Sequence, residues 1–200
     1  AFAAYRRGHD VAFASVDAFS QGEGSDIVAE VVRPKSGRLR DTAAACVLLA
    51  EASGAAGMAG GQAIDLDATG RAMTEAELER MHRMKTGALI RVSVRLGAAA
   101  GRPLAAGELA ALDAYANAAG LAFQVVDDVL DVEGSTATLG KTAGKDAAQG
   151  KPTYVSLLGL AGAKARAAAL ADDAHAALAP FDTASRRLAE VADSIVRRSH

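Results

Sequence analysis

The sequence has 200 residues, half of them hydrophobic, with 4% aromatic residues, no tryptophan and a formal net charge of −2. This length suits a single domain over residues 1–200, and frequent alanine with few β-branched runs predicts an all-α fold. The charge excludes a basic nucleic-acid surface, a lone cysteine excludes a disulfide framework and favours the cytoplasm, and no uninterrupted apolar run reaches the ~18 residues of a membrane span.

Residues 1–40 contain only short apolar pieces, and we leave them unassigned. The first predicted helix covers about residues 41–66, where the pattern is helical. This helix carries Gly54, Gly57, Gly60 and Gly61. Each interior glycine costs ~1 kcal/mol relative to alanine, so we expect close contact with a neighbouring helix or a ligand. Cys46 lies in its apolar part, where we interpret it as a buried small hydrophobic residue.

A second helix is predicted from about residue 75 to 99, because Thr74 and Glu77 form a capping box before it. Lys85 falls in the centre of its apolar stripe and therefore needs an anion, unless its long side chain snorkels to water. The next residue, Thr86, offers a hydroxyl donor to the same anion.

The third helix, from about residue 107 to 132, ends in the acidic run Asp127-Asp128-Val129-Leu130-Asp131. Asp127 and Asp131 are four residues apart and share one helix face, where their oxygens can chelate one hard cation. Asp128 sits about 100° round the helix, which predicts a position closer to water. A solvated, frayed helix end is the alternative interpretation. At the C-terminal end of a helix the macrodipole is negative and disfavours carboxylates, so a positively charged partner is expected.

The loop that follows carries Lys141, Lys145 and Lys151, each preceded by glycine, and reaches Pro152, which suits a first helical turn. Phosphate oxygens held between these lysines and metal-bound carboxylates would satisfy both charges, which predicts a metal-bridged diphosphate site. The spacing does not fit a nucleotide P-loop. Two more helices, split by Pro180, complete the chain, and Asp172-Asp173 on the first of them is interpreted as a solvated face.

With these motifs the chain resembles the trans-type short-chain polyprenyl diphosphate synthases, most strongly those that make farnesyl diphosphate. The resemblance covers nearly three-quarters of the chain, from about Gly57 onward, and rests on five motifs in order: Gly60-Gly61-Gln62 with Asp65, Lys85-Thr86-Gly87, Phe123-Gln124, Asp127-Asp128-Val129-Leu130-Asp131, and Gly140-Lys141 through Lys151-Pro152-Thr153-Tyr154. It implies an isoprenoid-synthase-type helical bundle around a central cavity, and a homodimer.

The resemblance also implies a reaction and a set of site residues. An allylic diphosphate (dimethylallyl or geranyl) would condense with isopentenyl diphosphate to give farnesyl diphosphate. Mg²⁺ would be bound by Asp127, and less directly by Asp128 and Asp131, while the diphosphate would be held by Lys85, Thr86, Gln124, Lys141 and Lys151. Lys85 and Asp127 are the implied catalytic residues. Phe123 and the small residues Ala116, Ala119 and Gly120 would shape the prenyl pocket, with ordinary core packing as the alternative.

The sequence departs from the family's pattern upstream. Members carry a first aspartate-rich motif and a glycine-lysine-arginine segment, yet no Asp-Asp pair precedes Asp127. Arg6 and Arg7 are interpreted as a remnant of the arginine pair that follows the first motif. We therefore expect the bundle to be incomplete at its N-terminus, with half of the metal site absent, which leaves the activity of this chain alone open.

Two alternatives to a prenyltransferase remain at this point. A non-catalytic, synthase-like subunit would explain the missing first motif, although the lysine tract from Lys141 to Lys151 is retained. A terpene cyclase shares metal-triggered ionisation, but such enzymes usually have aromatic-rich cavities, and this chain is poor in aromatic residues.

Overall fold

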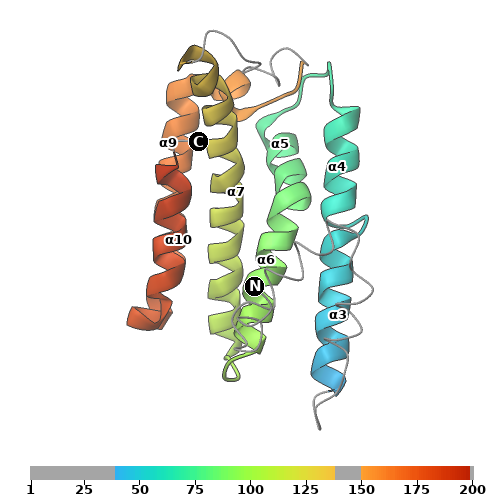
Figure 1. Cartoon of the computed structure of the whole chain (residues 1–200), viewed down its shortest axis with the longest axis vertical. Coiled ribbons are helices and arrows are strands. Elements are labelled where there is room, and N and C mark those ends of the chain that lie inside the picture. Colours follow the sequence, from blue (N-terminus) through green and yellow to red (C-terminus); the bar gives the residue numbers. More distant parts are fainter. Residues whose placement is uncertain (1–38, 138–149, 199–200) are drawn as a thin grey trace.

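The computed structural model describes residues 39–137 and 150–198, and its elements there are all helical, which confirms the all-α prediction (Figure 1). Residues 1–38, with Arg6 and Arg7, and the loop with Lys141 and Lys145 lie outside the described part. In chain order the elements are α3 (Leu39–Ser53), α4 (Met58–Asp67), α5 (Glu75–His82), η2 (Arg83–Gly87), α6 (Ala88–Ala99), α7 (Ala106–Ala137), α9 (Tyr154–Ala177), η3 (Ala179–Ser185) and α10 (Arg186–Arg197).

The long helix α7 lies in the middle of the bundle, between α9 and α10 on one side and α5 and α6 on the other (Figure 1). It packs chiefly against α9, and against α6 and η2 on another side. Its middle section is buried on more than one face, because Leu121, Val125 and Val129 are buried together with Leu112 and Ala116. The helix also continues to Ala137. The acidic run is therefore not in the last turn, where the macrodipole acts most strongly.

The predicted helix over residues 75–99 forms, with one change of geometry. Thr74 and Glu77 make the predicted capping box, in which the Glu77 carboxylate accepts from the Thr74 N–H at 2.8 Å. A π-helical turn, η2, interrupts the α-helical pattern at Arg83–Gly87 and contains Lys85. Such turns are rare and are frequently found at functional sites.

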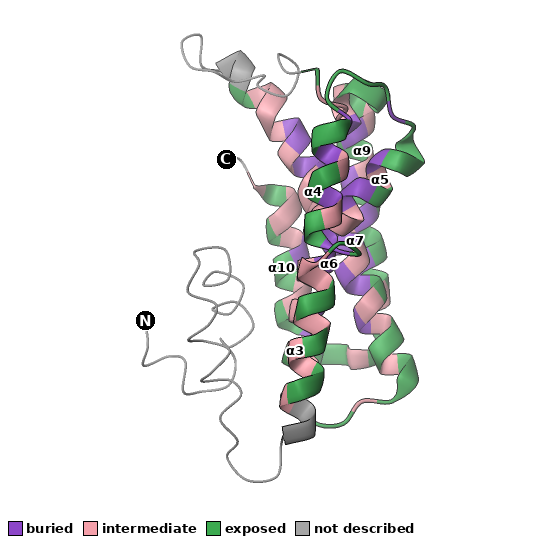
Figure 2. Cartoon of the chain, turned by 90° about the vertical axis from the view of Figure 1, so that its right-hand side faces the viewer, coloured by how far each residue is buried: buried purple, intermediate pink, exposed green. Residues whose placement is uncertain are grey.

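Helices α3 and α4 form one edge of the bundle and replace the single helix predicted over residues 41–66. The break falls at the glycine-containing segment between Ser53 and Met58. Cys46 is half-buried rather than buried, because α3 lies at the edge (Figure 2), so that interpretation was wrong.

Two described stretches, Thr42–Asp67 and Ala106–Gly134, are long and apolar enough to cross a membrane by length and composition alone. Charged residues interrupt both stretches, Glu51 in the first and Asp113 in the second, so neither is an uninterrupted apolar run. The second stretch is the core helix α7, and 56% of its apolar window is buried, whereas the first is only 6% buried. Two helices of this kind are weak evidence for a membrane protein.

The C-terminal helices close the other edge. Helix α9 begins at Tyr154 with Thr153 as its N-cap, so Pro152 precedes the helix instead of lying in its first turn. The Tyr115 hydroxyl of α7 donates to the Leu188 carbonyl of α10 at 2.7 Å, which ties the core helix to the last one. Asp172 and Asp173 are exposed, as predicted.

Candidate active site

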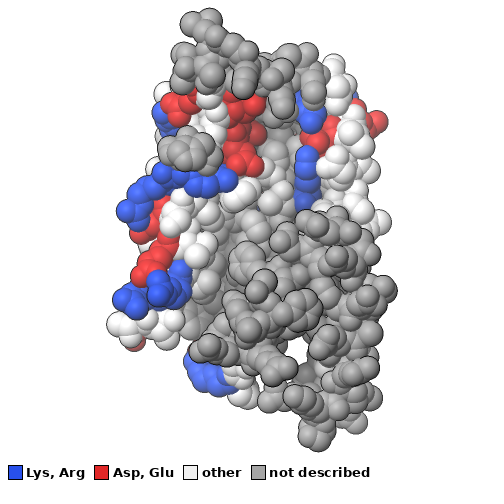
Figure 3. Space-filling view, in the orientation of Figure 1, with Lys and Arg blue, Asp and Glu red and all other residues white. Residues whose placement is uncertain are grey.

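A cavity of about 370 Å³ lies between α4, η2, α7 and the segment that leads into α9. It brings together six predicted site residues and one prenyl-pocket residue: Lys85, Thr86, Gln124, Asp127, Asp128, Lys151 and Phe123. Asp65, His82, Pro152 and Thr153 complete its lining. Asp131 is half-buried one turn beyond Asp127 and is not among the lining residues, and Lys141 lies outside the described residues. Figure 3 shows acidic side chains gathered toward the upper end of α7, with basic side chains on both sides.

The lysine side of the cavity is organised by a carboxylate. The Lys85 Nζ donates to the Asp65 Oδ2 at 2.7 Å, and the Lys151 Nζ lies 3.8 Å from the same oxygen. Asp65 is only 5% exposed. The prediction that Lys85 needs an anion is thus met inside the protein, by α4, and its ammonium group does not simply snorkel to water.

Thr86 and Gln124 connect η2 to α7 through side chains. The Thr86 hydroxyl donates to the Gln124 Oε1, and the Gln124 Nε2 lies 3.4 Å from the Asp127 Oδ2. The predicted Thr86 donor therefore contacts a neighbouring side chain here. This chain of contacts fixes the Gln124 amide between the lysine side and the acidic side of the cavity.

The first two aspartates of the acidic run differ in their surroundings. The Asp127 side chain is 44% exposed, whereas Asp128 is 7% exposed, so the prediction that Asp128 lies closer to water was wrong. The reason is that α7 is covered on several sides, and the Asp128 Oδ2 accepts from the Tyr154 N–H at 2.7 Å. Asp128 thereby binds a backbone donor at the start of α9 that has no partner within its own helix.

Arg198, the last residue that the structure describes, contacts the first aspartate of the acidic run. Its Nη2 donates to the Asp127 Oδ1 at 2.8 Å and to the Phe123 carbonyl at 2.9 Å, and its guanidinium lies 3.9 Å from the Phe123 ring centroid. Sequence reasoning missed Arg198 because 71 residues separate it from Asp127. Nothing in its local sequence distinguishes Arg198 from the arginines of α10, which ends one residue before it.

His82 is a second residue that the sequence analysis passed over. It is buried, its ring stacks on Tyr154 with centroids 5.9 Å apart, and its Nε2 lies 3.9 Å from the Asp128 Oδ2. Burial lowers the pKa of His82 to about 4, so the imidazole is neutral near pH 7. Its spacing of three residues from Lys85 on a helix is the signal that would have found it.

The four residues proposed to shape a prenyl pocket, Phe123, Ala116, Ala119 and Gly120, do not all lie at the cavity. Phe123 lines the cavity, whereas Ala116 and Ala119 belong to a buried cluster with Leu112 and Tyr115. A Cβ at Gly120 would lie 3.2 Å from the Gly87 Cα, so this glycine serves a close approach of α7 and η2. These three small residues are therefore part of helix packing and do not line the cavity.

The donor set suits a hard cation in combination with phosphate. Among the described residues no group of three or more His, Cys, Asp or Glu side chains converges on one metal position. Mg²⁺ characteristically binds through one or two carboxylates and fills its remaining positions with water and phosphate oxygens. Asp127 and Asp131, on successive turns of α7, fit that requirement, while one oxygen of Asp128 is engaged by the Tyr154 N–H.

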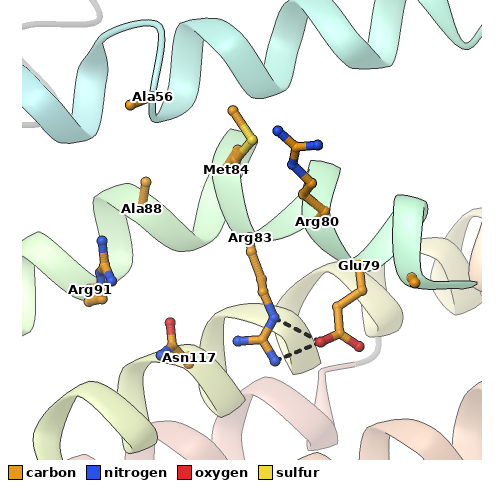
Figure 4. Close-up of a pocket in the computed structure, with 9 residues that line it drawn as sticks. Ala56, Glu79, Arg80, Arg83, Met84, Ala88, Arg91 and Asn117 are labelled. Carbon is orange, nitrogen blue, oxygen red and sulfur yellow. Dashed lines mark hydrogen bonds and ion pairs between the residues drawn. The ribbon is translucent and has the colours of Figure 1, made fainter. Parts of the chain in front are cut away.

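A larger cavity of about 520 Å³ lies between α5, η2, α6, α7 and the α3–α4 junction (Figure 4). Its lining includes three arginines but one acid, Glu79, which pairs with Arg83 at 2.7 Å and Arg166 at 3.3 Å. Because its acid is already paired and it has no carboxylate run, it lacks the metal-binding half of a diphosphate site.

An all-helical bundle with a cavity lined by lysines and aspartates is typical of isoprenoid synthases. Comparison with known protein families, sequences and structures agrees with this class. The chain belongs to the polyprenyl synthetase family, whose model matches residues 3–181. The farnesyl diphosphate synthase of Escherichia coli (strain K12) is 52% identical over 156 residues, which cover 76% of this chain and 52% of that protein. The chain spans about half the length of the curated relatives it matches.

Solved structures show the same fold. An FPP/GFPP synthase from Zymomonas mobilis is 33% identical, with a TM-score of 0.74 over 88% of this chain and 58% of that one. A geranyltransferase from Helicobacter pylori, complexed with magnesium and isoprenyl diphosphate, is 26% identical, with a TM-score of 0.72 over 88% of this chain and 57% of that one.

Proposed function

We propose that the protein containing this chain is a Mg²⁺-dependent short-chain trans-prenyltransferase, a geranyltranstransferase. It would condense dimethylallyl or geranyl diphosphate with isopentenyl diphosphate to give farnesyl diphosphate and inorganic diphosphate. One observation carries the proposal: a single cavity holds the Asp127 carboxylate on α7 and the Lys85 and Lys151 ammonium groups on its other side. Relatives named farnesyl diphosphate synthase support the choice of reaction.

In this proposal the site residues bind and stabilise a leaving group. Lys85, Lys151 and Gln124 donate to diphosphate oxygens, as does Lys141 from the loop, and Thr86 orients the Gln124 amide. As the allylic C1–O bond breaks, negative charge grows on the diphosphate, and these fixed donors stabilise it in the transition state. Asp127 and Asp131, and less directly Asp128, would hold Mg²⁺. The ion would neutralise part of the negative charge that grows on the diphosphate.

The chemistry that follows needs protection from water more than it needs a base. The C4 carbon of isopentenyl diphosphate attacks the allylic cation through its double bond, and loss of one proton restores an alkene. The departing diphosphate is itself a basic group and would accept that proton. Phe123 contributes an apolar ring to the cavity and offers no nucleophile to the cation.

As part of the same proposal we infer a cytoplasmic homodimer. The half-buried Cys46 suits a reducing compartment. The apolar stretch Thr42–Asp67, of which little is buried within one chain, supplies a surface that a second copy could cover.

The test is turnover by the full-length natural protein that contains this chain. With Mg²⁺, geranyl diphosphate and isopentenyl diphosphate should be converted to farnesyl diphosphate, and a chelator should stop the reaction. Tight binding of geranyl diphosphate without transfer would contradict the proposal and indicate a non-catalytic subunit. Hydrocarbon products formed without isopentenyl diphosphate would indicate a cyclase.

A further inference from the structure

Asp65 is a buried carboxylate in the candidate site to which neither a metal nor a diphosphate contact has been assigned. We infer that Asp65 is a positioning residue, which holds the Lys85 and Lys151 ammonium groups together so that they receive one diphosphate. This inference rests on the proposed function, because it concerns how that site binds its substrate. Its basis is the geometry of α4 against η2 and of α4 against the segment before α9.

The contact between α4 and η2 is unusually close at one point. A Cβ added to Gly61 would lie 2.2 Å from the Lys85 backbone nitrogen and 2.5 Å from its Cα, so no larger residue fits there. Asp65 follows Gly61 by four residues and therefore lies on the same face of α4. The close contact of α4 with η2 that requires glycine at position 61 therefore also brings the Asp65 carboxylate to Lys85.

A second contact holds the segment before α9, which carries Lys151, against the end of α4. The turn after α4 donates from the Gly70 N–H to the Gly150 carbonyl at 3.0 Å, and both glycines have positive φ, 77° and 64°. This region of backbone is accessible to glycine at little cost. Lys151 follows directly, and its ammonium group lies 3.8 Å from the Asp65 Oδ2. Backbone and side chain together fasten this segment to α4.

Asp65 solves an electrostatic problem that the two lysines create. Both ammonium groups approach one oxygen, so they are no further apart than the combined length of the two contacts, and at that distance they repel each other. The carboxylate between them offsets this repulsion before any ligand is bound. An ammonium group donates up to three hydrogen bonds, so the single hydrogen bond from Lys85 to Asp65 does not use all of its donors.

Two roles for Asp65 predict changes of opposite sign. If it only neutralises charge, Asp65→Asn makes the cavity more positive and tightens binding of an anion. If it positions the lysines, Asp65→Asn lets them separate, and binding weakens because the ligand must bring them back together. We expect weakening on the order of tenfold, the size of one charge-assisted hydrogen bond.

Isothermal titration calorimetry with inorganic diphosphate and MgCl₂ measures this affinity on the intact chain. Asp67→Asn is the matched control, since Asp67 lies on the same helix, is 84% exposed in its side chain and should leave the affinity unchanged. Weaker binding by Asp65→Asn alone supports positioning. Equal or tighter binding by Asp65→Asn overturns the inference.

A ligand-free measurement keeps the inference testable even if Asp65→Asn folds poorly. Lysine acylation followed by mass spectrometry should label Lys85 and Lys151 more slowly than Lys164, whose pair with Glu133 is solvent-exposed. Labelling of Lys85 and Lys151 as fast as Lys164 in the wild-type chain overturns the inference while leaving prenyl transfer possible. Conversely, slow labelling and weakened binding without prenyl transfer would overturn only the proposed function.

Discussion

Helices α7 and α4 contribute opposite sides of the site and are held in the fold in different ways. The middle of α7 is buried among apolar side chains of α9, α6 and η2, which stabilises it independently of any ligand. The buried residues of α4, Gly61 and Asp65, form a narrow stripe with the N-cap Gly57. This stripe makes close backbone approaches and a charge contact, and few apolar contacts. Changes in α7 packing should therefore affect stability alone, whereas changes in the α4 stripe should affect stability and diphosphate binding together.

The largest effect is expected at the exposed acid on the α7 side. Asp127→Ala removes the half-exposed carboxylate proposed to hold Mg²⁺, and turnover should fall by roughly a hundred- to a thousandfold, the usual scale for loss of one transition-state contact. Steady-state assays of the full-length protein measure it, with exposed Asp172→Ala as the control. Unchanged turnover would mean that Asp127 serves only as the partner of Arg198.

His82, between the two sides, should make stability depend on pH. Its pKa is lowered to about 4 in the fold from an ordinary value of 6.5, so the unfolded chain binds the proton more readily between these values. Stability from this group is fully present above pH 6.5 and is lost as the pH falls toward 4, by up to about 3 kcal/mol. Urea titrations across this range should show the decline, and His82→Leu should flatten it. An equal slope in both proteins would contradict the assignment.

Gly61→Ala tests the α4 stripe directly. The new methyl group would meet the Lys85 backbone, so the free energy of unfolding should fall by about 1–3 kcal/mol and diphosphate affinity should fall with it. Gly97→Ala is the control, because a Cβ there meets nothing within 4 Å and alanine should add about 0.5–1 kcal/mol. Denaturation combined with calorimetry measures both quantities. A destabilised Gly61→Ala variant with normal diphosphate affinity would separate the two functions that we assign to this stripe.

The smallest effect is expected from a packing contact of α7 that is remote from the site. Tyr115→Phe removes the hydroxyl that donates to the Leu188 carbonyl and should cost about 1 kcal/mol of stability. Because the contact only joins α7 to α10, diphosphate affinity should not change. A loss of affinity in this variant would show that the two sides of the molecule are more strongly coupled than the comparison implies.

Local sequence signals predicted much of what the structure contains. The capping box at Thr74 and Glu77 starts a helix where predicted, and the polar residues selected on helical phase, Lys85 and Asp127, line one cavity. These predictions hold because helical periodicity and capping depend on residues within about one turn of one another. Errors arose where a prediction assumed how far a helix face is covered: Asp128 on α7 is more buried than expected, and Cys46 on α3 is less buried.

The sequence by itself determined the all-helical class, the family and the residue types that suit a metal and a diphosphate. Only the tertiary structure decided which partners those residues have: Asp65 for Lys85, the Tyr154 N–H for Asp128, and Arg198 for Asp127. The physical reason is distance along the chain. Helix formation and facial phase are set by near neighbours, whereas a buried charge is stabilised by whichever group the packing of distant helices brings within hydrogen-bonding reach.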